Sequence, residues 1–169
     1  MRGDSVLTNF EIIGTDTPDL RKIYETQLES LIALAQLLVG DRGLAEELVQ
    51  DSFARILERP PRLRDAEALE PYVRSAVLNA SRSKLRRLAL ERKRAEPSPA
   101  SSTDITPDHE LREALLELPI RQRQCVALRF YEDRTVDDIA NLLDIGSGSV
   151  KTHLHRGLKR LEELLEEKP

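Results

Sequence analysis

The 169-residue sequence has little cysteine, glycine or aromatic residue. It contains a single cysteine, Cys125, which excludes an intramolecular disulfide and is typical of proteins in a reducing compartment. Aromatic residues make up only 4% of the chain, and there are seven glycines, whereas Ala, Leu, Arg and Glu are abundant. This composition favours helices over strands, so we expect an all-α fold.

Long hydrophobic runs are also missing. No stretch approaches the ~20 apolar residues that a membrane-spanning helix requires. The first 15 residues contain no continuous apolar core of the length found in signal peptides. We therefore expect a soluble, cytoplasmic protein that does not insert into a membrane.

No catalytic or cofactor-binding motif is recognisable. His153 and His155 are two residues apart on a predicted helix, so they face different directions, and no cysteine or third histidine lies near them in the sequence. Gly146 and Gly148 are not followed by the Gly-Lys-Ser/Thr of a phosphate-binding loop. We expect no catalytic residue, no metal and no cofactor, and a helical enzyme is disfavoured.

Apolar residues at helical spacing predict two small helical domains joined by a flexible linker. In the first domain, helices are expected from about Pro18 to Val39, from Asp41 to just before Pro60, and from Ala68 to Arg94, with Tyr72 turned inward. A segment with three prolines and several Ser, Thr and Asp residues then reads as a linker. The expected organisation is a tail at 1–17, a helical domain at 18–95, a linker at 96–109 and a second helical domain at 110–169.

Charge is unevenly distributed, although the net charge is only −4. Residues 1–70 hold 14 acidic and 8 basic side chains, whereas residues 71–96 hold 2 acidic and 8 basic side chains. The basic residues of the third helix are Arg74, Arg82, Lys84, Arg86, Arg87, Arg92, Lys93 and Arg94. Such a run is usually a solvated helix face, but it also suits contact with nucleic acid.

The last third of the chain is predicted to form a helix-turn-helix. Thr135 and Asp138 have the spacing of a capping box, and Asp144 stands where the turn needs left-handed backbone geometry. Ala140 permits close helix contact and Ile145 is expected to fill the turn. The final helix, from about Ser147 to Glu166, directs one apolar arc to the core and a polar arc outward. The predicted core residues are Val150, Leu154, Leu158, Leu161 and Leu165, and the predicted reading residues are Lys151, Thr152, His155, Arg156 and Lys159.

The segment LPIRQRQCVALRFYEDRTVDDIANLLDIGSGSVKTHLHRGLKRL closely resembles the fourth conserved region of extracytoplasmic function sigma factors. LLVGDRGLAEELVQDSFARIL resembles the second region of that family, and YVRSAVLNASRSKLRR resembles the part of it that meets the minus-ten element. The resemblance covers about residues 20–165. It implies an RNA polymerase sigma factor that binds the core enzyme and directs transcription initiation.

The resemblance also implies roles for individual residues. The last helix would read the minus-thirty-five element through its five outward residues, with Arg156 on guanine and Lys159 on phosphate. The minus-ten element would be met by Arg62, Leu63, Arg64, Asn79, Arg82 and Arg86, with Asn79 binding an unstacked base. Glu47, Gln50 and Asp51 would dock on the beta-prime subunit of the polymerase, although a solvated acidic face explains each of them equally well.

The family resemblance implies further partners and leaves one rival interpretation open. The expected partners are the beta-prime and beta subunits of core RNA polymerase, promoter DNA and an anti-sigma factor, and the free chain is expected to be a monomer. The rival is a stand-alone helix-turn-helix regulator that binds duplex operators. That interpretation accounts only for the last third of the sequence.

Overall fold

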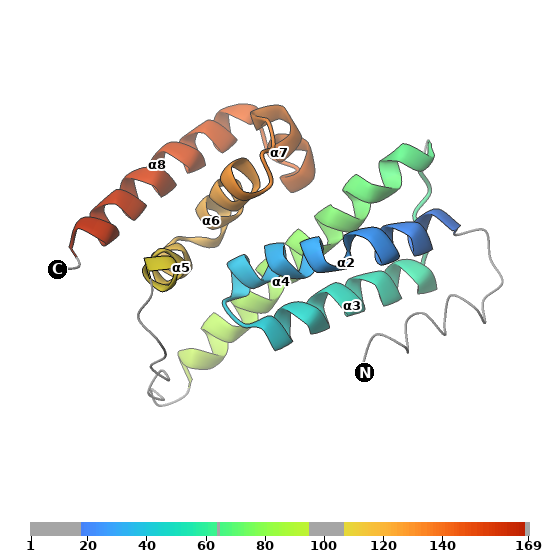
Figure 1. Ribbon diagram of the computed structural model, residues 1–169, viewed down its shortest axis with the longest axis horizontal. Helices are drawn as coiled ribbons and strands as arrows, with labels where there is room; N and C mark the ends of the chain where they lie inside the picture. Colours follow the sequence, from blue (N-terminus) through green and yellow to red (C-terminus); the bar gives the residue numbers. More distant parts are fainter. Residues whose placement is uncertain (1–17, 64, 95–106, 168–169) are drawn as a thin grey trace.

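The computed structural model describes residues 18–63, 65–94 and 107–167, in which there are seven α-helices and no strand (Figure 1). The elements are α2 (Pro18–Val39), α3 (Arg42–Glu58), the 3-10 turn η1 (Ala66–Ala68), α4 (Leu69–Arg92), α5 (Pro107–Glu117), α6 (Ile120–Val126), the π-helical turn η2 (Ala127–Tyr131), α7 (Val136–Leu143) and α8 (Ser147–Glu166). The all-α prediction is confirmed. The predicted tail, Arg64 and most of the predicted linker lie outside the described residues. None of the described helices is long and apolar enough to cross a membrane.

Helices α2, α3 and α4 pack together as an N-terminal group. Gly40 ends α2 with a φ of +81°, a backbone conformation that glycine adopts without steric cost. Asp41 then caps α3, because its carboxylate accepts a hydrogen bond of 2.7 Å from the Leu44 amide. In the core of this group, the rings of Tyr24 and Phe53 meet edge to face with centroids 5.0 Å apart.

Helices α5 to α8 form a C-terminal group in which α8 crosses α5, α6 and α7. Its close packing depends on Gly157, since a Cβ there would lie 3.0 Å from Val126 Cγ2. The buried side of α8 consists of Val150, Gly157, Leu161 and Leu164. Leu161 and Leu164 pack in one cluster with Leu115 and Leu118.

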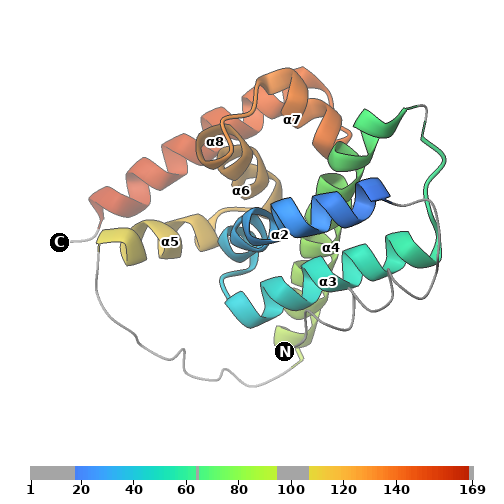
Figure 2. The same ribbon diagram turned by 45° about the vertical axis from the view of Figure 1, so that its right-hand side comes forward.

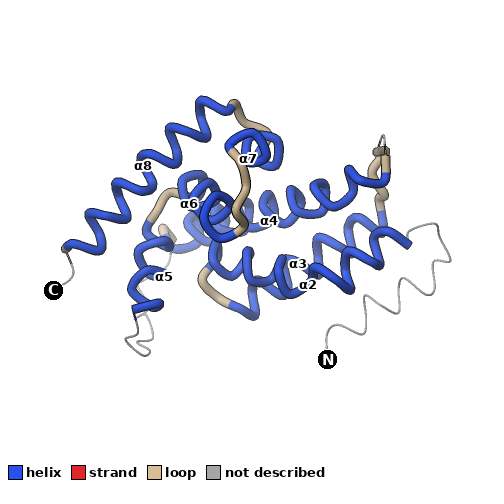
Figure 3. The backbone as a smooth tube through the Cα atoms, turned by 45° about the horizontal axis from the view of Figure 1, so that its top comes forward, coloured by secondary structure: helices blue, strands red, loops and turns tan. Residues whose placement is uncertain are grey.

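The two groups share a hydrophobic core. Leu34, Leu38 and Leu78 of the N-terminal group cluster with Cys125, Leu128, Ile139 and other buried residues of the C-terminal group. Figure 2 shows α5 and α6 beside α2, and α7 beside α4. The tube view in Figure 3 shows the same two helical groups packed face to face with short loops between their helices. The sequence did not predict this contact between the groups.

Three predictions of burial were wrong. Tyr72 is 40% exposed, Leu158 is 43% exposed and Leu165 is 39% exposed. In α8, the buried side of the helix is centred on positions such as Gly157 and Leu164, which pack toward α6 and α5. Leu158 and Leu165 therefore lie at the edge of the buried side. In α4, the adjacent residue Val73 takes the core position, which leaves Tyr72 at the surface.

Candidate nucleic-acid interface

The helix-turn-helix has the local geometry that its sequence predicts. The Asp138 amide donates to Thr135 Oγ1 at 3.1 Å, and the Thr135 amide donates to Asp138 Oδ2 at 3.2 Å, which completes the capping box. Hydrogen bonding of the Asp138 carboxyl to the side chain and amide of Thr135 lowers the pKa of that carboxyl. Asp144 adopts the left-handed conformation, with φ 53° and ψ 51°, and the amide of Ile145 donates to Ala140 O at 3.0 Å. The partly buried Ile145 side chain packs on the shared core.

The outer face of α8 presents all the residues that were predicted to read duplex DNA. The side chains of Lys151, Thr152, His155, Arg156 and Lys159 are exposed. Thr152 Oγ1 donates to the Gly148 carbonyl at 3.0 Å, so its hydroxyl proton is engaged while the oxygen can still accept a hydrogen bond. The opposite face is fixed in the core, so α8 is a rigid support for this cationic surface.

The basic face of α4 is smaller than the sequence predicts. Asn79 and Arg86 are exposed and Arg82 is half-buried, but Arg74 is only 3% exposed. The Arg74 guanidinium is bound by Glu70, Gln27 and Glu132, so Arg74 does not belong to a solvent-facing cationic surface. Its assignment to the basic face was wrong.

The loop before α4 carries the other residues predicted to meet single-stranded DNA. Arg62 is exposed and Leu63 is half-buried, whereas Arg64 lies outside the described residues. Leu63 lines a hollow of about 370 Å³ between the two groups. Arg134 and Asn141 line the same hollow. Tyr72 lines both this hollow and the groove between α3 and α4, so Leu63 lies near the Tyr72 end of α4.

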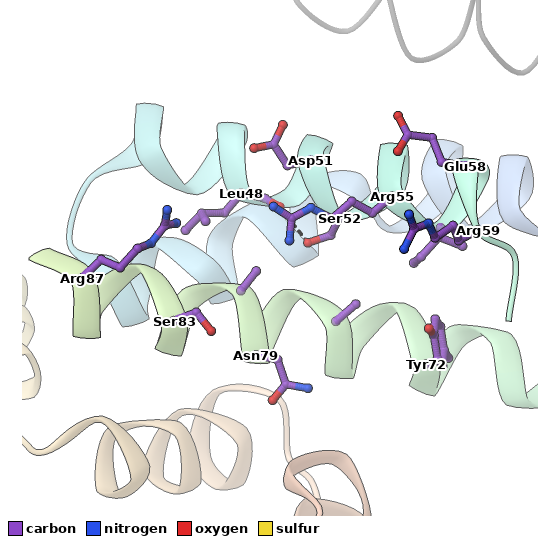
Figure 4. A pocket seen from close by; sticks show the side chains of 13 residues that line it. Leu48, Asp51, Ser52, Arg55, Glu58, Arg59, Tyr72, Asn79, Ser83 and Arg87 are labelled. Atoms are coloured by element: carbon purple, nitrogen blue, oxygen red, sulfur yellow. Dashed lines mark hydrogen bonds between the residues drawn. The ribbon is translucent and has the colours of Figure 1, made fainter.

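A groove of about 660 Å³ runs between α3 and α4 (Figure 4). Its residues are Leu48, Asp51, Ser52, Arg55, Ile56, Glu58, Arg59, Tyr72, Ala76, Asn79, Ala80, Ser83 and Arg87. It brings Asp51, a predicted docking residue, together with Asn79, a predicted base-binding residue. Glu47 is exposed and Gln50 is half-buried on α3, and both lie outside the groove lining.

The groove adds Tyr72, Arg55 and Arg59, which sequence reasoning missed, to Arg87 of the predicted basic run. Tyr72 supplies an exposed aromatic ring on which a base can stack, and Arg55, Arg59 and Arg87 supply cations for phosphates. The sequence around Tyr72 was ambiguous, because an aromatic residue beside a buried valine can lie either in the core or at the surface. The side-chain amide of Asn79 lies on the same side of α4 as this ring, two helical turns later in the sequence.

Cations from both groups converge where α4, α6 and α8 meet. Burial lowers the pKa of Arg121, and the charges of Arg82 and Arg86 lower it further. Burial also lowers the pKa of His153, with smaller contributions from Arg121 and Arg156. Charges of α4 therefore act on Arg121 of α6, and the charge of Arg121 acts in turn on His153 of α8.

Comparison with known proteins gives matches across both groups. Residues 23–91 match the model of Sigma-70 region 2, and residues 108–161 match that of Sigma-70, region 4. The RNA polymerase sigma-E factor of Streptomyces avermitilis is 31% identical, with 88% of this chain and 86% of that protein covered. The RNA polymerase sigma factor SigV of Bacillus subtilis is 30% identical, with coverages of 75% and 78%.

A solved structure has a similar fold. It is the sigma factor RpoE of Bartonella quintana, crystallised with the anti-sigma factor NepR. The TM-score is 0.70 at 21% identity, and the match covers 89% of this chain and 99% of that one.

Proposed function

Because this chain belongs to the extracytoplasmic function sigma factors of the sigma-70 family, we propose that its two exposed surfaces divide promoter recognition between them. The chain is an RNA polymerase sigma factor that binds the core enzyme and directs promoter recognition and transcription initiation. Sigma factors are non-enzymatic initiation factors. The rival, a stand-alone operator-binding regulator, is not favoured, because residues 23–91 match a region specific to sigma factors.

The α8 surface reads the upstream, minus-thirty-five element. A single observation carries this assignment: five exposed polar and cationic side chains stand on one face of a helix that the core holds rigidly from behind. Arg156 binds a guanine edge through two parallel hydrogen bonds, and Lys151, Thr152 and His155 contact neighbouring bases. Lys159 neutralises a backbone phosphate.

The α4 surface captures the separated strand of the minus-ten element. Asn79 offers an amide donor and acceptor to an unstacked base, and Tyr72 provides a ring for stacking. Arg82 and Arg86, together with Arg62, Leu63 and Arg64 of the preceding loop, hold the strand and its phosphates. The shared groove supports this assignment for Tyr72 and Asn79 in particular.

The proposed contacts to protein partners lie on α3 and on the C-terminal group. Glu47, Gln50 and Asp51 dock on the beta-prime subunit, and the C-terminal group contacts the beta subunit. The crystallised complex of the similar RpoE with NepR supports an anti-sigma factor as a further partner of this chain. We place the protein in the cytoplasm as a monomer when it is free, without a catalytic residue, a metal or a cofactor.

Capture of core RNA polymerase tests the function directly. Wild-type chain is expected to retain purified bacterial core enzyme and to produce run-off transcripts from a matched promoter. The double variant Gln50→Ala, Asp51→Ala should lose capture, whereas Glu29→Gln, an exposed change on α2, should not. Tight binding of duplex DNA by the chain alone, with no capture of polymerase, would instead support the regulator.

A further inference from the structure

A hollow of about 280 Å³ lies between the later turns of α4 and the start of α6. Its lining combines apolar and cationic side chains, and we call it the cationic hollow: Leu85, Arg86, Leu88, Ala89, Arg92, Ile120 and Arg123. It shares no residue with the groove between α3 and α4. Pockets for small molecules are mostly apolar with a few placed polar groups, and their volumes begin at about 300 Å³. The size and lining of the hollow therefore suit a small ligand.

Two helices supply this lining. Leu85 and Arg92 mark the ends of one face of α4, because the apolar lining positions between them recur at intervals of three and four residues. Ile120 and Arg123 of α6 are three residues apart and therefore also share a face. Arg86 and Arg92 are exposed, whereas Arg123 is only 7% exposed. Apolar side chains and three arginines thus meet at one place from two helices.

Arg123 is a buried cation without a carboxylate partner. Its two terminal nitrogens donate to the carbonyls of Leu38, Leu116 and Leu118, which carry no formal charge. Its Nε is buried and has no hydrogen-bond partner in the part of the chain that the structure describes. Charged side chains are almost never fully buried unless an opposite charge pairs with them. Burial also lowers the pKa of Arg123, to about 10. Arg123 therefore has a charge to compensate and one donor to satisfy.

The exposed arginines of the hollow also lack an opposite charge. No acidic residue lines the hollow, and neither Arg86 nor Arg92 forms an ion pair with any residue of the described ranges 18–63, 65–94 and 107–167. Burial and the charge of Arg82 lower the pKa of Arg121 on α6, and Arg86 adds a smaller contribution. Uncompensated positive charge is therefore concentrated at the contact of α4 with α6.

We propose that the cationic hollow binds a small phosphate monoester with an apolar body. The planar guanidinium group of arginine matches the oxygens of a phosphate, and each nitrogen–oxygen contact is a charge-assisted hydrogen bond. A phosphate monoester carries a charge of about −1.5 to −2 at neutral pH and three acceptor oxygens, so it can serve all three arginines. A carboxylate has only two oxygens and one charge. The apolar body lies against Leu85, Leu88 and Ile120.

This site goes beyond the proposed recognition of the promoter. Of the residues that line the hollow, only Arg86 also belongs to the proposed minus-ten surface. Leu85, Leu88, Arg92 and Ile120 have no role in that surface, in the α8 surface or in the docking face of α3.

Nuclear magnetic resonance of the full chain, titrated with phenyl phosphate at constant ionic strength, tests the site. Phenyl phosphate has both a ring and a phosphate, whereas inorganic phosphate supplies the charge alone and phenol supplies the ring alone. Phenyl phosphate is expected to shift the methyl signals of Leu85, Leu88 and Ile120 and the Nε signal of Arg123, and to reach saturation. It should bind about tenfold more tightly than inorganic phosphate, and phenol should cause no saturable shift.

Three variants separate the hollow from general attraction to a basic helix. Arg92→Gln removes one exposed cation from the hollow and should weaken phenyl phosphate binding about tenfold. Ala89→Glu places a carboxylate at an exposed lining position, keeps a good helix former and should abolish saturable binding. The matched control is Arg87→Gln, which removes the same charge from α4 but from the side that lines the groove with α3. Its affinity for phenyl phosphate should stay within about twofold of the wild type.

Two results would overturn the site. Equal weakening by Arg92→Gln and Arg87→Gln, with helical circular dichroism intact, would mean that the total charge of α4 attracts phosphate. Shifts that do not saturate, or that spread equally over α3 and α8, would mean an adventitious ion only. The titration uses neither polymerase nor DNA, so failure of the chain to capture core polymerase would contradict the proposed function and leave this result unaffected.

Discussion

Arg156 illustrates how one exposed side chain on α8 can carry sequence discrimination. A guanidinium that binds O6 and N7 of one guanine distinguishes that base by about 1–3 kcal/mol. We therefore expect Arg156→Ala to reduce transcription from promoters with the preferred upstream base by about tenfold, and much less from promoters altered at that base. Run-off transcription on both promoter sets measures this, with Lys159→Ala as a comparison that should weaken all of them similarly. Equal losses from Arg156→Ala on every promoter would contradict base reading by Arg156.

The free energy of unfolding is expected to depend on pH through His153. Burial, assisted by the charges of Arg121 and Arg156, lowers its pKa in the folded chain below the unfolded value of about 6.5. The unfolded chain then binds more protons in this window, so the free energy of unfolding falls as the pH is lowered through about 6.5. Urea unfolding at pH 7.5 and 5.5 should show a smaller fall for His153→Gln than for wild type. The exposed His155→Gln serves as the control, and an identical fall in all three proteins would refute the role of His153.

At the scale of helices, local signals in the sequence predicted the elements well and their faces less well. The capping box at Thr135 and the left-handed turn at Asp144 depend on a few neighbouring atoms, so their residue types were sufficient. The inner face of α8 depends instead on how closely α6 approaches at Gly157. Tyr72 was misassigned for the same reason, because only the packing of α3 against α4 decides which of two adjacent apolar residues is buried.

Arg123 shows how one side chain can join the ends of several helices. It donates to the carbonyls of Leu38, Leu116 and Leu118, near the carboxyl ends of α2 and α5, where carbonyls have no partner within their own helix. Burial lowers its pKa to about 10, so it remains charged at neutral pH. We expect Arg123→Met to destabilise the fold by about 1–3 kcal/mol, because these carbonyls lose their donor. Thermal unfolding measures this against Arg112→Met, which removes an exposed pair on α5 and should change stability little.

For the whole molecule, the sequence did not predict that the two helical groups share a core. Leu20, Tyr24 and Leu31 of α2 lie in the core of the N-terminal group, whereas Leu34 on another side of the helix is fully buried against the C-terminal group. A helix that is apolar on more than one face has neighbours on more than one side, and that broader stripe was the available signal. Arg74 was misread for a related reason: its partner Glu132 is 58 residues away, beyond the reach of any local pattern.

The contact between the two helical groups also includes repulsion between like charges. The charges of Arg82 and Arg86 of α4 lower the pKa of Arg121 of α6, so they oppose the packing of the two groups, although Asp144 offsets them in part. Arg121→Gln removes one member of this cluster and keeps a polar group that can hydrogen-bond to Gln124 in place of the present 3.1 Å contact.

We therefore expect Arg121→Gln to raise the free energy of unfolding slightly, as measured by urea unfolding. Added salt should stabilise the wild type, because it screens the repulsion between these partly exposed cations. The same addition should affect Arg121→Gln less, since less repulsion is left to screen. A free energy of unfolding that falls in Arg121→Gln would mean that the hydrogen bond from Arg121 to Gln124 stabilises the fold more than cation repulsion destabilises it.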